Sequence, residues 1–260
     1  MKLKVLLGFA VVMIAALAGG AYWFFVVNMI HGSGVELVET RELDSFHQIH
    51  LSCAADVDVS IGEVQSITVT GDDNIVPLIT TELSEGRMTI DCDKRYRSKL
   101  GINLKVTVLK LDSLVLGGSG DIKTGAIEGD SMNAEISGSG SIKIASFTGS
   151  SCQTRVGGSG SVEIGRLKGK DLTAKVSGSG NVKISGEATN LEAKISGSGN
   201  LNLADLTVQN AVAKVSGSGN IKVRAEESLK AGISGSGNIS QYGKAKPDAS
   251  VSGSGRVNQR

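Results

Sequence analysis

Residues 172–203 read LTAKVSGSGNVKISGEATNLEAKISGSGNLNL, and the fold can be predicted from the repeat that they contain. It contains the tripeptide Gly-Ser-Gly twice, beginning at Gly178 and at Gly197. A period near 20 residues is typical of a solenoid, in which each repeat stacks on the one before it. The tripeptide recurs at spacings of 18 to 20 residues, beginning at Gly118, Gly138, Gly158, Gly178, Gly197, Gly217, Gly235 and Gly253.

Apolar residues occupy every second position on both sides of each triplet. With the first glycine as position zero, the apolar columns lie at −6, −4, −2, +4 and +6. Around Gly178 these positions hold Leu172, Ala174, Val176, Val182 and Ile184. A period of two indicates β-strands, because successive side chains point to opposite faces. Residues 117–260 therefore predict an all-β, right-handed parallel β-helix with coils of about 18–20 residues.

The triplets and the residues beside them predict which contacts join one coil to the next. Both glycines lie at even-numbered positions, as the apolar columns do, and so have the same parity. We therefore expect both to face inward, either where the coil is too thin for a side chain or where the backbone needs a positive φ. Position +3 is mostly Asn or Ser, and one carboxylate in that column, Asp121, is too little for a calcium ladder. Stacked asparagines bond to one another. The column therefore predicts a structural asparagine ladder.

The chain before the repeat divides into four segments. Residues 5–30 carry no charge and follow Lys2 and Lys4, which predicts a transmembrane signal anchor, with a cleaved signal peptide as the alternative. Residues 1–4 then form a cytoplasmic tail, and residues 31–34 a linker to the exported part. Residues 35–116 predict an irregular β segment that caps the solenoid. We expect a single-pass protein of the bacterial inner membrane, with its C-terminal part in the periplasm or outside the cell.

The repeat resembles the head GIN domain of autotransporter adhesins, a family named for its Gly-Ile-Asn-type repeats. Ser-Gly-Ser-Gly-Asn followed by Val, Ile or Leu recurs at Ser177, Ser196, Ser216 and Ser234. Arg41-Glu42-Leu43-x-x-Phe46-x-x-Ile49 and Gly71-Asp72-Asp73-Asn74-x-x-Pro77 also resemble the family's leading segment. The resemblance covers about residues 34–260 and implies an exported β-helical module. It supplies no catalytic or ligand-binding residues.

Charge is balanced over the whole chain but divided along it. The formal net charge is +1, which gives no general attraction to nucleic acid. Residues 118–260 hold 17 basic and 12 acidic residues, whereas residues 35–117 hold 8 and 14. If the triplet bends gently, outward cations at −3 and +5 flank a flat strip of serines that suits an anionic envelope polymer. The cations of this predicted strip are Lys123, Lys143, Arg155, Lys175, Lys183, Lys194, Lys214 and Lys222.

We therefore predict a non-enzymatic binding or adhesion module of the cell envelope, with no cofactor, metal or catalytic residue. The membrane is its partner through residues 5–30, and an anionic envelope polymer or a protein is the further candidate partner. A scaffold that self-associates through the last coil is the alternative, since an uncovered strand edge can pair with another chain. A polysaccharide-cleaving β-helix enzyme is the third hypothesis. The coils have nearly constant length, however, which leaves no room for the long loops that would build a substrate cleft.

The three cysteines fall into two groups. Cys152 lies in the inward −6 column and is expected to be a small buried apolar residue. Cys53 and Cys92 lie outside the repeat, and they form a candidate disulfide in an oxidising compartment.

Overall fold

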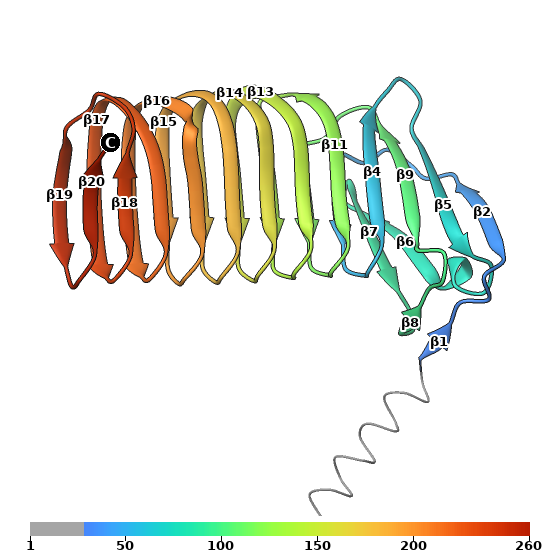
Figure 1. Cartoon of the computed structure of the whole chain (residues 1–260). Coiled ribbons are helices and arrows are strands. Elements are labelled where there is room, and N and C mark those ends of the chain that lie inside the picture. Colours follow the sequence, from blue (N-terminus) through green and yellow to red (C-terminus); the bar gives the residue numbers. More distant parts are fainter. Residues whose placement is uncertain (1–28) are drawn as a thin grey trace, which may run out of the picture.

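The computed structural model describes residues 29–260, so the expected anchor over residues 5–30 lies outside the described residues except for Met29 and Ile30. From residue 29 onward, no helix is long and apolar enough to cross a membrane. The described chain is all-β apart from one 3₁₀ turn, η1 (Val76–Leu78). Its strands stack into a parallel solenoid, visible as the row of ribbons in Figure 1.

Each turn of the solenoid has two long walls that meet at the triplet, which forms the sharp turns along one edge of Figure 1. Wall A runs toward the triplet and wall B runs away from it. Wall A consists of β7 (Arg87–Cys92), β3 (Gln48–Leu51), β10 (Ser113–Leu116), β12 (Ser131–Ile136), the second halves of β13 (Ser141–Val156), β14 (Ser161–Val176), β15 (Asn181–Ile195), β16 (Asn200–Gly217) and β17 (Asn220–Gly235), and β19 (Pro247–Ser252). Wall B consists of β9 (Asn103–Val108), β4 (Asp56–Ile61), β11 (Asp121–Glu128), the first halves of β13 to β17, β18 (Asn238–Gln241) and β20 (Arg256–Gln259).

Like positions stack on like positions, as the repeat predicts. Ile142 pairs with Val162 on wall B, and Val156 pairs with Val176 on wall A. All four side chains are at most 1% exposed. The prediction of a parallel β-helix built on inward apolar columns is therefore confirmed.

The solenoid is narrow at the triplet and wide at its far side. The second glycine of the triplet is buried in all but the last turn, and the first is half-buried. A Cβ on Gly140 would overlap the carbonyl oxygen of Gly120 on the preceding turn and would lie 2.9 Å from Leu116 Cδ2. Positive φ explains only part of the pattern, because among the triplets it occurs at Gly217, Gly235 and Gly253 alone. The chief reason for glycine is thus the backbone of the neighbouring turn.

Two further turns of the solenoid lie in the segment that lacks triplets. β3 and β4 form one turn, which lies between the turn of β10 and β11 and the turn of β7 and β9. In this turn, Cys53 and Ala55 occupy the positions of the two triplet glycines. In chain order, the turn of β3 and β4 therefore comes first, although it is the second turn in space. The turn of β7 and β9 follows and lies outside it, at the cap. The chain then crosses back to β10, on the other side of the β3 and β4 turn, and the solenoid continues from there. The predicted irregular β segment is part of the solenoid and also its cap.

Antiparallel strands cover the outer edge of the turn formed by β7 and β9, which is the first turn of the solenoid. β6 (Ile79–Ser84) pairs with β7, β5 (Ser66–Asp72) pairs with β9, and β2 (Glu36–Arg41) pairs with β5. The short β1 (Ile30–His31) pairs with β8 (Tyr96–Arg97) beside them. Because these strands occupy the edge, the backbone groups of the first turn are already paired at the cap.

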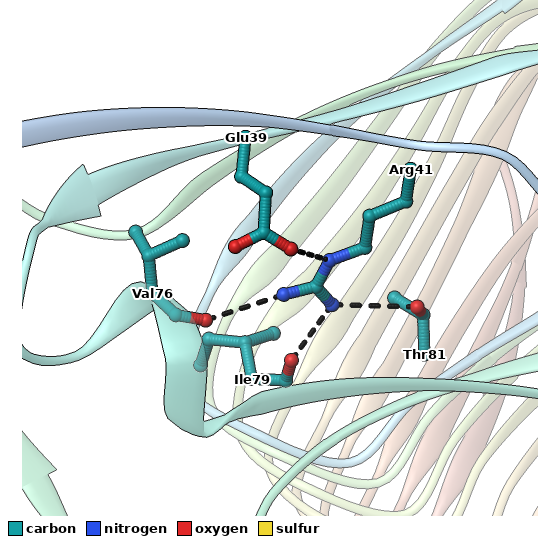
Figure 2. Close-up of polar contacts among 5 residues, drawn as sticks. All are labelled: Glu39, Arg41, Val76, Ile79 and Thr81. Atoms are coloured by element: carbon teal, nitrogen blue, oxygen red, sulfur yellow. Dashed lines mark hydrogen bonds and ion pairs between the residues drawn. The ribbon is translucent and has the colours of Figure 1, made fainter.

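Arg41 ties the cap together from within, as Figure 2 shows. Its guanidinium donates to the carbonyl oxygen of Ile79 at 2.7 Å and to that of Val76 at 3.2 Å. Glu39 holds the same guanidinium at 2.7 Å, and Thr81 Oγ1 accepts at 3.3 Å. Arg41 thus fixes η1, which lacks a side-chain cap of its own, to β2. The first motif of the leading segment therefore has a structural role.

Asp72, from the second motif, holds the neighbouring loops. Its side chain has no exposed surface, and its carboxylate accepts the backbone N–H groups of Gly34 at 2.7 Å and Lys99 at 2.9 Å. The N–H of Leu100 and the hydroxyl of Ser98 also donate to it. The bonds from Ser98 and the backbone lower the pKa of Asp72 to about 2, since they favour the charged form.

We expect Asp72→Asn to loosen the cap in a pH-dependent way. The lowered pKa stabilises the folded state above about pH 4, and this contribution is lost as the pH falls through about 2. Denaturant midpoints should therefore differ most between wild type and Asp72→Asn at neutral pH and converge toward pH 2. The control is Asp44→Asn, at an exposed carboxylate. A difference that stays constant between pH 5 and pH 2 would contradict this role.

The last turn is more open than the others. Val251, in the −2 column, is 44% exposed, whereas Ile233 of the preceding turn is 4% exposed. Self-association through this turn stays a prediction.

Candidate ligand-binding groove

The eight predicted cations lie on two different walls. Arg155, Lys175, Lys194 and Lys214 follow one another in the −3 column of wall A. Lys123, Lys143, Lys183 and Lys222 lie in the +5 column of wall B. The triplet between these columns is a sharp turn rather than a gentle bend (Figure 1), so the structure does not bring the two columns together on one flat strip.

Carboxylates on adjacent turns engage three of the eight cations. Arg155 lies 3.6 Å from Glu135, Lys175 lies 3.3 Å from Glu192, and Lys183 lies 3.2 Å from Glu163. Such exposed pairs contribute about 0–1 kcal/mol each, and they reduce the local positive charge. Within residues 29–260, Lys194 and Lys214 make no such ion pair, although they are neighbours in one column.

A groove of about 380 Å³ opens on wall A beside these two lysines. Serine hydroxyls border it, from Ser216, Ser234, Ser250 and Ser252. Gly232 follows Lys214 in the −3 column and leaves the groove open where earlier turns carry a long side chain. A Cβ at Gly232 would meet only Lys214 Cγ, at 3.7 Å, so packing does not demand glycine here.

Two other hollows on the solenoid contain an acidic group. The hollow of about 320 Å³ on wall B is lined by Lys123 and Lys143 but also by Glu163. The hollow of about 670 Å³ at the wide side is lined by Arg166 and Lys168 together with Glu187. Among residues 29–260, no acidic residue lines the wall A groove. It is therefore the best suited of the three to an anionic group.

The wide-side hollow has a clear origin in the sequence. One residue is missing from the turn that begins at Gly178, and the register of β14 and β15 shifts between Ile164 and Leu167. Gly186 takes the position of Leu167 there with φ of +121°. Sequence reasoning missed this hollow, although the 19-residue spacing marks its place.

The asparagine ladder is confirmed, and it is structural. The side-chain amide of Asn200 donates to Asn181 at 3.0 Å, that of Asn220 to Asn200 at 3.1 Å, and that of Asn238 to Asn220 at 3.1 Å. A second ladder, which sequence reasoning missed, links Asp171, Asn190, Asn210 and Ser228 on the outer surface. Both ladders bind one turn to the next and use the amides that a ligand would otherwise meet.

The acidic residues of the outward columns also bind their neighbours. Asp121 accepts the backbone N–H of Ser141 at 2.9 Å and its hydroxyl at 2.7 Å. Glu135 and Glu163 are the partners of Arg155 and Lys183. Glu135 lies on wall A and the other two on wall B, so these three do not form a carboxylate pair across one cleft.

Comparison with known proteins agrees with this architecture. The structure of a "putative adhesin" from Parabacteroides merdae has a TM-score of 0.86 at 20% identity, covering 90% of this chain and 99% of the other. A "putative adhesin" from Parabacteroides distasonis has a TM-score of 0.85 at 21% identity, covering 90% and 100%. A "putative lipid binding protein" from Parabacteroides distasonis has a TM-score of 0.85 at 23% identity, covering 89% and 99%.

These structures share the fold with this chain. No curated protein matches it. The model of the family described as "Putative auto-transporter adhesin, head GIN domain" matches residues 45–245. That match covers both walls of the solenoid and most of the cap, and the chain therefore belongs to the head GIN domain family.

Proposed function

We propose that the protein is a non-enzymatic binding module of the bacterial envelope, exported and held at the inner membrane by residues 5–30. The wall A groove at Lys194, Lys214 and Gly232 carries the proposal, and its ligand is an anionic envelope polymer. Membership of an adhesin-head family supports the binding role. The uncharged run of residues 5–30 supports the anchor and the export.

The chemistry of the groove favours a hydroxylated anion such as an acidic polysaccharide. Two lysines without acidic partners supply the positive charge, and serine hydroxyls can both donate and accept hydrogen bonds. None of the described residues that line the groove is aromatic, so the groove offers no ring on which a sugar could stack. Affinity should therefore depend on charge and fall steeply as salt is added.

Charge reversal on wall A should abolish most of the binding. We expect Lys194→Glu with Lys214→Glu to weaken binding of polygalacturonate by at least about tenfold at low salt, since each lost contact with a charged group is worth about 1.5 kcal/mol or more. The measurement is biolayer interferometry of the full chain in detergent at 20 and 300 mM salt. Gly232→Leu should weaken binding by filling the groove while leaving the charge unchanged.

Wall B provides the matched control. Lys123 and Lys143 are also neighbours in one column, and their reversal to glutamate changes the net charge by the same amount. This control variant should bind nearly as well as wild type. Equal losses on both walls would mean that only net charge matters, and full binding by the wall A variant would reject the groove.

A further inference from the structure

Cys92 and Cys53 occupy, on the first two turns of the solenoid, the position that the first glycine of the triplet occupies on the later turns. Cys53 follows Leu51 by two residues, Cys92 follows Ile90 by two residues, and Leu51 and Ile90 are direct partners in the parallel pair of β3 and β7. The backbone N–H of Ser52 donates to the carbonyl oxygen of Ile90 at 2.9 Å, which is one of the hydrogen bonds of this last pair. Cys53 and Cys92 are therefore equivalent positions on adjacent turns.

This register gives a spacing that suits a disulfide. Adjacent strands lie about 4.8 Å apart, and disulfides join Cα atoms about 4.4–6.8 Å apart. Cys53 keeps the inward parity of Leu51, and Cys92 keeps that of Ile90. Both side chains line one hollow of about 410 Å³, together with Ala54 and Tyr96.

The two cysteines differ in their exposure to solvent. Cys53 is 8% exposed, and Cys92 is half-buried, with its thiol donating to the Lys94 carbonyl oxygen at 2.8 Å. The hydroxyl of Tyr96, which also lines the hollow, donates to the Ala54 carbonyl oxygen at 2.8 Å. All three cysteines are free thiols in the structure.

We propose that Cys53 and Cys92 form a disulfide that fastens the end of β7, and the loop that follows it, to the turn formed by β3 and β4. The loop that follows Cys92 contains β8 (Tyr96–Arg97), which pairs with β1 (Ile30–His31). The bond would therefore lie close to the point where the described chain enters the cap. The proposal rests on the proposed export only for the oxidising compartment that makes the bond in the cell.

The bond forms by exchange with an external disulfide. The Cys92 thiolate attacks that disulfide and releases one thiol, and the Cys53 thiolate then attacks the Cys92 sulfur and releases the second. Two protons and two electrons leave the protein. Burial raises the pKa of the Cys53 thiol to about 12 and also raises the pKa of Cys92, which slows exchange once the cap has closed.

Trypsin separates the three cysteines cleanly. The chain has no Lys or Arg between Arg41 and Arg87, so Cys53 falls in peptide 42–87, Cys92 in 88–94 and Cys152 in 144–155. The full chain, taken from membranes of a Gram-negative host in the presence of iodoacetamide, should carry one alkyl group rather than three. Peptides 42–87 and 88–94 should appear as one linked species, and Cys152→Ala should keep that link.

Two further measurements make the outcome decisive. The full chain refolded in detergent with oxidised and reduced glutathione should form the same link, which tests the geometry without export. Reductant should lower the thermal midpoint by about 10 °C in wild type, because the bond closes a loop of roughly 40 residues. Cys53→Ala with Cys92→Ala should show no such shift.

Each contrary result has a distinct meaning. Three alkylated cysteines after refolding in the glutathione buffer would overturn the proposal, whatever the location of the protein. A link that forms on refolding but not in cells would keep the paired geometry and reject the exported, oxidised state. A link whose reduction leaves the thermal midpoint unchanged would overturn the role as a fastening.

Discussion

Gly140→Ala should destabilise the protein by at least about 3 kcal/mol, although it adds a single methyl group. Gly140 is the second glycine of its triplet and is buried. The new methyl would overlap the carbonyl oxygen of Gly120 and lie 2.9 Å from Leu116 Cδ2. A backbone carbonyl is fixed by its own ladder, so the two turns must separate and lose hydrogen bonds on both sides.

The control for this experiment is a glycine of the same segment that has free space around it. A Cβ on Gly129 would meet nothing within 4 Å. Gly129→Ala should therefore be neutral or stabilise by about 0.4–1 kcal/mol through the unfolded state. Chemical denaturation followed by circular dichroism measures both. Equal denaturant midpoints for the two variants would show that the stack of triplets tolerates a side chain.

The stacking of the solenoid could be predicted from the sequence because it depends on two local properties. Parity assigned the inward side chains, and the repeat length assigned which residues lie above one another. Both properties also place Asn181, Asn200, Asn220 and Asn238 in one outward column, which the structure confirms as a hydrogen-bonded ladder. Neither property depends on the shape of the cross-section.

The shape of the cross-section and the order of the first turns could not be predicted. Parity is the same whether the triplet bends gently or sharply, so it does not show that Lys123 and Lys194 lie on different walls. The turn at residues 48–61 has Cys53 and Ala55 in place of glycines. Without a triplet, nothing in the sequence marks it as a turn that lies between residues 87–108 and residues 113–128.

Only part of the wall A groove could be predicted from the sequence. The cations of the −3 column were identified, but their partners depend on which acidic side chain lies on the next turn. Glu192 reaches Lys175 and Glu135 reaches Arg155, whereas Lys214 has Gly232 as its next neighbour. The absence of a side chain at Gly232 opens the groove, but a glycine within a strand often marks a bulge or a close approach of two backbones instead.

Phe147→Ala should produce the second large effect, a loss of about 3–5 kcal/mol. Phe147 is 1% exposed and heads the fully buried side chains of residues 29–260 in volume. It lies between Ile127 and Leu167 on the adjacent turns, at the wide side of the solenoid. Gly149 leaves room for the ring, because a Cβ there would lie 2.6 Å from Phe147 Cζ. Truncation would leave a cavity that these fixed backbones cannot close.

Two companion variants separate the cavity from the loss of an apolar group. Phe147→Leu keeps the column apolar and should cost less, since Leu already occupies it at Leu167. Val64→Ala, at a side chain that is 78% exposed, should change stability by less than about 0.5 kcal/mol. Because each turn contacts only its neighbours, the damage should stay local at first. Hydrogen exchange should therefore increase in β11, β13 and β14 before it increases in β4 and β9, and uniform exchange across the chain would argue against independent turns.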